Sequence, residues 1–106
     1  MKETVAILGA GTMGRGMAQV AALAGHVVWL YDPFLSALEK SLAEIHADLQ
    51  KMAEKKRLPG PVDEILARIH PTQSLEDCAQ ADLVIEAAPE KLELKQELLG
   101  KLGELN

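Results

Sequence analysis

The chain has 106 residues, of which 48% are hydrophobic and 25% are charged, and its formal net charge is −5. This composition is typical of one globular domain and excludes a disordered chain or two full-sized domains. The acidic balance argues against nucleic-acid binding, which depends on a broad Lys and Arg surface. The single cysteine, Cys78, cannot form an internal disulfide, so we expect a reducing, cytoplasmic setting.

The sequence gives no sign of a membrane-spanning helix or of a metal site. The longest apolar run is far shorter than the roughly 20 residues that a membrane-spanning helix needs. No group of His, Cys, Asp or Glu has the spacing of metal ligands, so no metal site is expected.

A strand, a helix and a second strand are predicted in the first 31 residues. Residues 4–8 (TVAIL) form a short apolar run that Gly9 stops, as in a buried parallel strand. Residues 13–24 are rich in alanine and end before Gly25, a favourable residue just beyond a helix. Residues 27–31 (VVWLY) are β-branched and aromatic, which favours a strand. Together they have the size of one βαβ unit.

A helical hairpin is expected after the second strand. The apolar positions of its first helix are spaced 3, 4, 3, 4 and 3 residues apart: Leu35, Leu38, Leu42, Ile45, Leu49 and Met52. A turn at residues 58–61 (LPGP) then leads into a second helix. That helix has its own apolar positions at Val62, Ile65, Leu66 and Ile69.

The remaining segments complete an α/β pattern. We expect a brief strand at residues 70–72, a short helical turn at 75–78, a buried strand at Asp82–Glu86 and a last helix that begins at Pro89. The predicted fold is a Rossmann-type doubly wound parallel sheet, truncated after Asp82–Glu86, with the helical hairpin inserted after the second strand.

The turn after the first strand has the pattern G-x-G-x-x-G, at Gly9-Ala10-Gly11-Thr12-Met13-Gly14. The pattern is informative here because it follows a predicted strand and opens a predicted helix. Gly9 permits the tight turn, Gly11 lets a pyrophosphate approach the backbone, and Gly14 lets the helix pack close to the sheet. The N–H groups at the start of the helix would then bind the phosphates.

An acidic residue, Asp32, ends the second strand 23 residues after Gly9. A carboxylate at this position accepts hydrogen bonds from the ribose hydroxyls of NAD and repels the 2′-phosphate of NADP. The sequence therefore predicts an NAD site in residues 1–106. The alternative is an ordinary βαβ unit in which the glycines only make a turn and Asp32 only caps a helix.

Two stretches resemble the L-3-hydroxyacyl-CoA dehydrogenases, which include bacterial 3-hydroxybutyryl-CoA dehydrogenases. They are GAGTMGRGMAQVAALAGHVVWLYD and, after the helical hairpin, ADLVIEAAPEKLELKQEL. This family oxidises the 3-hydroxyl of an acyl-CoA with NAD. The resemblance covers essentially the whole chain and implies that it is the NAD-binding domain of such an enzyme.

The resemblance also implies roles for single residues. The six residues Gly9, Ala10, Gly11, Thr12, Met13 and Gly14 would form the pyrophosphate loop, and Asp32 would bind the adenosine ribose. Glu90 and Lys95 match two more cofactor-contacting positions, and Lys55 matches a position that contacts coenzyme A. Asp48 stands where some members have a serine that also contacts coenzyme A.

These last positions have simpler interpretations too. Glu90 and Lys95 fall in the first turns of a predicted helix, where Glu favours the helix dipole and Lys is solvated. Lys55 lies beside Lys56 and Arg57, which is also the pattern of a solvated helix end.

No catalytic residue is expected within the 106 residues. In the family, the histidine base, the residues that position the thioester and a helical substrate domain all follow the stretch that this chain matches. His26, His46 and His70 are interpreted as structural or solvated. We therefore expect the full-length protein to be an NAD-dependent dehydrogenase acting on an acyl-CoA, and this chain alone to be inactive.

Two other functions stay open from the sequence. One is the cofactor domain of another β-hydroxyacid dehydrogenase, of the 3-hydroxyisobutyrate or 6-phosphogluconate type. The other is a free-standing module that binds or senses NAD. We expect the domain to form a homo-oligomer through the outer edge of the strand Asp82–Glu86, which is left unpaired.

Overall fold

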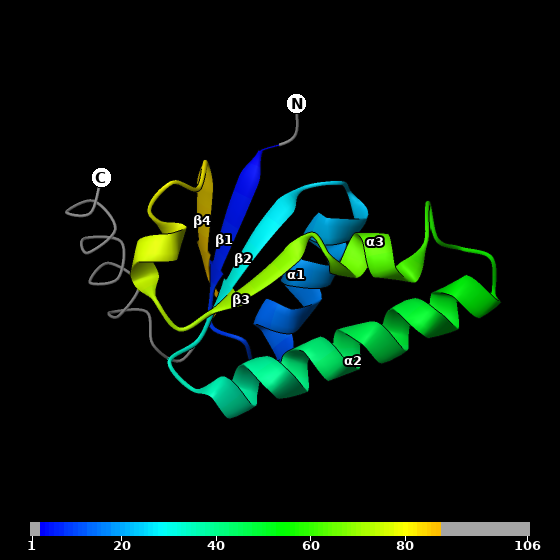
Figure 1. The fold of residues 1–106 in the computed structure, drawn as a ribbon, viewed down its shortest axis with the longest axis horizontal. Helices are drawn as coiled ribbons and strands as arrows, with labels where there is room; N and C mark the ends of the chain where they lie inside the picture. The colour runs from blue at the N-terminus through cyan, green and yellow to red at the C-terminus, as the bar shows by residue number, and fades with distance from the viewer. Residues whose placement is uncertain (1–2, 88–106) are drawn as a thin grey trace.

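The computed structural model describes residues 3–87 and forms an α/β fold with one parallel sheet. Figure 1 shows the elements in chain order. They are β1 (Thr4–Leu8), α1 (Thr12–Leu23), β2 (Val27–Tyr31), α2 (Leu35–Glu54), α3 (Val62–Leu66), β3 (Ile69–Thr72), the 3-10 turn η1 (Leu75–Cys78) and β4 (Leu83–Glu86). The sheet order is β3-β2-β1-β4, the order of a doubly wound fold, as predicted.

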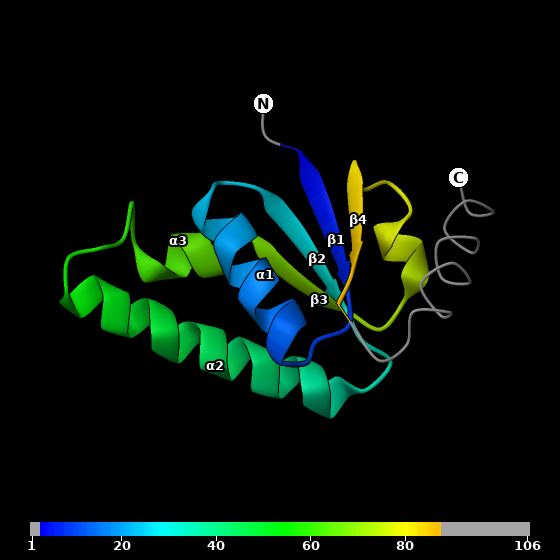
Figure 2. The same ribbon diagram turned by 180° about the vertical axis from the view of Figure 1, so that it is seen from behind.

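The two faces of the sheet are covered by different elements. The helices α1, α2 and α3 lie on one face and η1 lies on the other, as Figures 1 and 2 show from opposite sides. Alternate residues of β1 serve the two cores, since Val5 and Ile7 pack toward the helices while Ala6 and Leu8 pack toward Cys78. β1 is apolar from its second residue on and is buried there, as expected of a strand covered on both faces.

Helix α1 packs close to the sheet through small residues. Its buried positions are Gly14, Ala18 and Ala22, which recur every four residues along one face. A Cβ atom added at Gly14 would lie 1.7 Å from the carbonyl oxygen of Gly9. The prediction that Gly14 permits close packing is therefore confirmed. Gly25, with a φ of 97°, follows the helix as predicted.

The helical hairpin has one long and one short arm. Helix α2 has 20 residues and buries Leu38, Ile45 and Leu49, three of the predicted apolar positions. Helix α3 has only five residues, and Ile69, predicted to extend its apolar face, instead begins β3. The chain leaves the helix early because Val28 donates a backbone hydrogen bond to Arg68, which starts the pairing of β3 with β2. Pro71 is tolerated in β3 because this strand lies at an edge.

Candidate functional site

The glycine turn lies where the carboxyl ends of three strands meet. Leu8, the last residue of β1, is in register with Tyr31 of β2 and Glu86 of β4. Two backbone hydrogen bonds extend this alignment into the turn: Gly9 N–H to Tyr31 at 2.7 Å and Ala87 N–H to Leu8 at 3.0 Å. In an open α/β sheet, ligands bind outside these carboxyl ends, at the point where the strand order reverses. Here that point lies between β1 and β4.

The three glycines of the turn have distinct environments. Gly9 has a φ of 116°, a left-handed conformation that favours glycine. Gly11 is the N-cap residue of α1 and has a φ of −77°. No atom lies within 4 Å of a Cβ added at Gly11, so its outer side is open. The structure therefore distinguishes a glycine needed for the turn, a glycine needed for packing and one that leaves space beside the helix N-terminus.

Asp32 ties the end of β2 to the glycine turn. Its Oδ2 accepts a hydrogen bond from the backbone N–H of Ala10 at 2.9 Å, and its Oδ1 accepts one from Phe34 N–H, also at 2.9 Å. The second contact is an Asx turn that leads into α2, but Asp32 does not cap this helix, because its N-cap residue is Phe34 and makes no side-chain capping hydrogen bond. The carboxylate is half-buried and each oxygen keeps a further lone pair. The carboxylate can therefore accept hydrogen bonds from ribose hydroxyls while it keeps its hydrogen bonds to Ala10 and Phe34.

A cavity of about 340 Å³ lies beside the glycine turn, between α1 and α2. It is lined by Ala10, Gly11, Thr12, Arg15, Ala37, Lys40, Ser41 and Glu44. Arg15 bridges the two helices, with its Nε 2.9 Å from Glu44 and its Nη1 3.4 Å from Asp48. Sequence reasoning did not predict this bridge, although Glu44 and Asp48 are four residues apart and so share one face of a helix.

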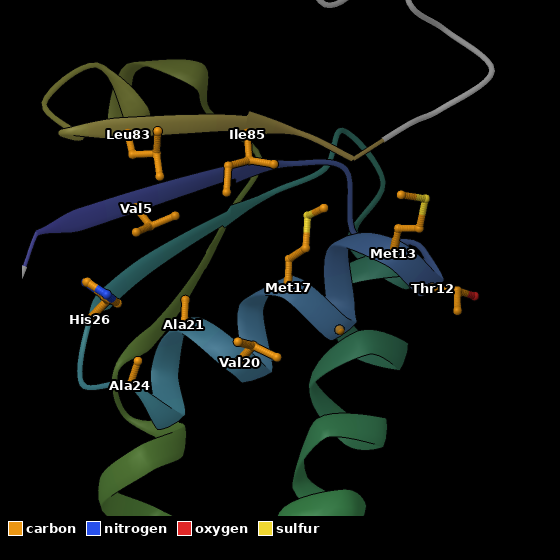
Figure 3. Close-up of a pocket in the computed structure, with 11 residues that line it drawn as sticks. Val5, Thr12, Met13, Met17, Val20, Ala21, Ala24, His26, Leu83 and Ile85 are labelled. Atoms are coloured by element: carbon orange, nitrogen blue, oxygen red, sulfur yellow. The ribbon is translucent and has the colours of Figure 1, made fainter.

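A larger cavity, about 680 Å³, runs along the other side of α1 and has an apolar lining. Figure 3 shows that α1, β1 and β4 all contribute to it, with Met17 rising from the helix toward the strands. Thr12 and Met13 lie at the end nearest the glycine turn. Leu83 and Val20 are 48% and 68% exposed. The cavity thus follows the sheet edge formed by β4.

The histidines lie away from the glycine turn. His26 contacts the carbonyl of Glu3 at 2.9 Å, before β2 begins, and His46 contacts Gln50 on α2. His70 packs against Trp29 with its ring tilted by 33° and 4.9 Å between ring centroids. Among residues 3–87, no group of three potential ligands is placed to hold a metal ion, and no helix is long and apolar enough to cross a membrane.

The hydroxyl group of Tyr31 and the thiol of Cys78, which lie behind the site, stay protonated at neutral pH. Burial, and then the carboxylate of Asp32, raise the pKa of Tyr31. Burial raises the pKa of the Cys78 thiol to about 11, with a further contribution from Asp77. Neither group is therefore a nucleophile or base at neutral pH.

The remaining sequence candidates are placed as follows. Lys55 caps the carboxyl end of α2, is exposed, and precedes Lys56, which has a φ of 56°. Glu90 and Lys95 lie outside the described residues. Thr12 and Met13 open α1 and are exposed beside the turn, while Ala10 is buried within it.

Comparison with known proteins decides which family carries this arrangement. Residues 4–106 match the family model described as "3-hydroxyacyl-CoA dehydrogenase, NAD binding domain". The chain belongs to this family. The resemblance noted in the sequence is therefore confirmed, as is the assignment to an NAD-binding domain.

Individual relatives agree with the family model. A 3-hydroxyadipyl-CoA dehydrogenase of Escherichia coli (strain K12) is 44% identical over 97% of this chain and 22% of its own length. The mitochondrial hydroxyacyl-coenzyme A dehydrogenase of Rattus norvegicus is 40% identical over 92% of the chain and 33% of its own length. The crystal structure of a 3-hydroxybutyryl-CoA dehydrogenase from Escherichia coli K12 superimposes with a TM-score of 0.89 at 42% identity, over 99% of the chain and 22% of that structure. This NAD-binding domain thus spans a third or less of each of these three relatives.

Proposed function

We propose that this NAD-binding domain binds NAD through the glycine turn and Asp32, as the cofactor domain of a dehydrogenase that acts on 3-hydroxyacyl-CoA substrates. The observation that carries the proposal is the hydrogen bond between Asp32 and Ala10, which joins the ribose-binding acid to the phosphate-binding turn. The open side of Gly11 supports the same role, because a pyrophosphate needs close approach to the backbone there.

The glycine turn and Asp32 would bind different parts of the cofactor. The N–H groups at the start of α1 and the partial positive charge of the helix would hold the pyrophosphate beside Gly11, Thr12 and Met13. The Asp32 carboxylate would accept hydrogen bonds from the hydroxyls of the adenosine ribose. Its negative charge would disfavour binding of NADP, which carries a 2′-phosphate. Glu90 and Lys95 remain predicted contacts for the rest of the cofactor.

In the reaction of the full-length protein, C3 of the substrate would lose a hydride and the hydroxyl group on C3 would lose a proton, so that a keto group forms. NAD, when bound, takes the hydride. We expect the general base to lie in the part of such dehydrogenases that this chain does not match, since the three histidines here lie away from the turn. This domain would therefore bind and orient the cofactor but would not move the proton.

Two partner roles complete the proposal. Lys55, exposed at the end of α2 beside two further cations, would attract the phosphates of coenzyme A. The outer edge of β4 would pair with a second copy of the chain, giving a homo-oligomer.

The first test is an equilibrium titration with NADH and, separately, NADPH, followed by the fluorescence of Trp29, three residues before Asp32 on β2. We expect saturable NADH binding and at least about tenfold weaker NADPH binding, because Asp32 repels the 2′-phosphate. Asp32→Asn should reduce this preference. Equal binding of both cofactors, or of neither, would contradict the proposal.

A matched pair of variants tests the glycine turn. Gly11→Ala adds a methyl group that meets no protein atom within 4 Å, so the fold should be retained while NADH binding falls. Gly16→Ala also adds a methyl group in open space, but one turn further along α1. It should leave NADH binding unchanged. Circular dichroism of both variants controls for folding.

A further inference from the structure

The turn between β2 and α2 presents an exposed aromatic side chain, Phe34, beside Asp32. Its exposed fraction is 69%, and it belongs to neither core cluster. The chain has only three aromatic residues, and the other two, Trp29 and Tyr31, pack against the core behind the sheet. A single exposed apolar residue is common in proteins, so the position of Phe34 rather than its exposure carries the argument.

The backbone around Phe34 is held from three sides. Its N–H donates to Asp32 Oδ1 at 2.9 Å, and its carbonyl accepts from Ala37 N–H at 3.1 Å as the first turn of α2 begins. The preceding carbonyl, of Pro33, accepts from the side chain of Gln73 at 3.0 Å. The ring therefore projects from a fixed turn, so a ligand that packs on it would not have to order the backbone first.

The geometry of a nucleotide determines what would lie beside this ring. If Asp32 accepts the ribose hydroxyls and the glycine turn binds the phosphates, the 5′ side of the ribose faces the turn. The base leaves the opposite end of the sugar ring and is directed away from the glycine turn. Phe34 follows Asp32 by two residues, and two residues of extended chain span about 7 Å at most. That distance keeps Phe34 within reach of a base attached to the ribose.

We propose that Phe34 forms an apolar platform for the adenine ring of the dinucleotide. An aromatic ring offers a flat apolar face to a flat base, and such contacts strengthen binding without hydrogen-bond recognition of the base. The inference rests on the proposed function, because it takes the ribose to be bound at Asp32.

The test compares two ligands that differ only by the base, AMP and ribose 5-phosphate, and adds NADH. Their dissociation constants are measured for the wild-type chain and for Phe34→Ala. We expect Phe34→Ala to weaken AMP and NADH by the same factor, about five- to tenfold, the lower part of the range for base stacking. Binding of ribose 5-phosphate should not change. Phe34→Tyr should keep the wild-type affinities, because its ring is retained.

Leu35→Ala is the matched control, since Leu35 is the next residue and is 55% exposed. It should bind AMP as the wild type does, and the melting temperatures of all variants should agree. Unchanged AMP affinity in Phe34→Ala would overturn the inference, as would an equal loss for ribose 5-phosphate, which would mean that the turn itself had moved. Wild-type chain that binds neither NADH nor AMP would overturn the proposed function together with the inference.

Discussion

Gly14 and Gly16 lie two residues apart in α1, and their surroundings impose opposite requirements. A Cβ at Gly14 would clash with the backbone of Gly9, whereas one at Gly16 would meet open space. Gly14→Ala should therefore lower the free energy of unfolding by about 2 kcal/mol or more, since the clashing atoms are backbone. Gly16→Ala should raise it by up to about 1 kcal/mol, because alanine favours a helix. Urea denaturation followed by circular dichroism measures both, and equal stabilities would contradict the packing argument.

Because the Cys78 thiol is buried, we expect the free energy of unfolding to depend on pH. Burial raises its pKa to about 11, above the value of about 8.5 for an unfolded chain. The folded state therefore holds the proton more strongly, and its stabilising contribution is complete below about pH 8.5 and is lost as the pH rises toward 11. The decrease should be on the order of 3 kcal/mol, since each unit of pKa difference corresponds to about 1.36 kcal/mol.

A cysteine variant separates this effect from other titrations. Cys78→Ala should flatten the loss of unfolding free energy over the same pH range, although it also lowers stability at neutral pH by leaving a small cavity. The wild-type thiol should react slowly with iodoacetamide at neutral pH. Parallel pH profiles for the two proteins would show that other groups, such as Tyr31, account for the dependence.

At the scale of elements, the bridge from Arg15 to Glu44 and Asp48 joins the first turn of α1 to the middle of α2. Both carboxylates are more than one-third exposed, so each pair is screened by solvent and contributes little by itself. Removing the arginine also leaves two like charges four residues apart on one helix face. Arg15→Ala should therefore destabilise the domain by roughly 1 kcal/mol at low salt, and by less at high salt.

A double-mutant cycle checks this bridge. Glu44→Gln in the Arg15→Ala background should cost less stability than Glu44→Gln alone, with a coupling of about 0.5 kcal/mol or more. Lys40→Ala removes a charge one turn before Glu44 on the same helix face, so it should change stability by only about 0.2–0.5 kcal/mol. Additive stability changes would mean that the bridge contributes nothing.

The elements were largely predictable because their signals are local. The signals are the apolar runs of the strands, the spacing of apolar residues in α2 and the glycines at the two ends of α1. Each acts within a few residues of the structure that it specifies. The short α3 was not foreseen, because the pairing of β3 with β2 overrides the apolar spacing that includes Ile69. Within the site, the sequence predicted the turn and Asp32 but not the Arg15 bridge or the hydrogen bond from Ala10. The bridge depends on which helix faces meet, and the hydrogen bond depends on the register of β1 with β2, and composition and spacing determine neither.

At the scale of the whole molecule, two features coincide at one side. Within residues 3–87, β4 pairs with β1 alone and forms one edge of the sheet, the kind of strand that pairs with another chain. The apolar cavity along α1 adjoins this edge and includes exposed Leu83 and Val20. An edge next to an uncharged apolar surface favours pairing with a second copy, while the net charge of −5 opposes it by repulsion.

This balance predicts how association depends on conditions and on one strand residue. The fraction of dimer in sedimentation velocity should rise with protein concentration and with salt, because salt screens the repulsion more than it weakens apolar contact. Leu83→Lys places a charge on β4 and should shift the chain to monomer. Val27→Lys, at a 39% exposed position on β2, should leave the dimer intact, and neither variant should alter NADH affinity. A monomer at every protein and salt concentration, or equal loss of dimer in both variants, would show that β4 is not the interface. Neither result would bear on the cofactor site, because that site lies at the carboxyl ends of the strands.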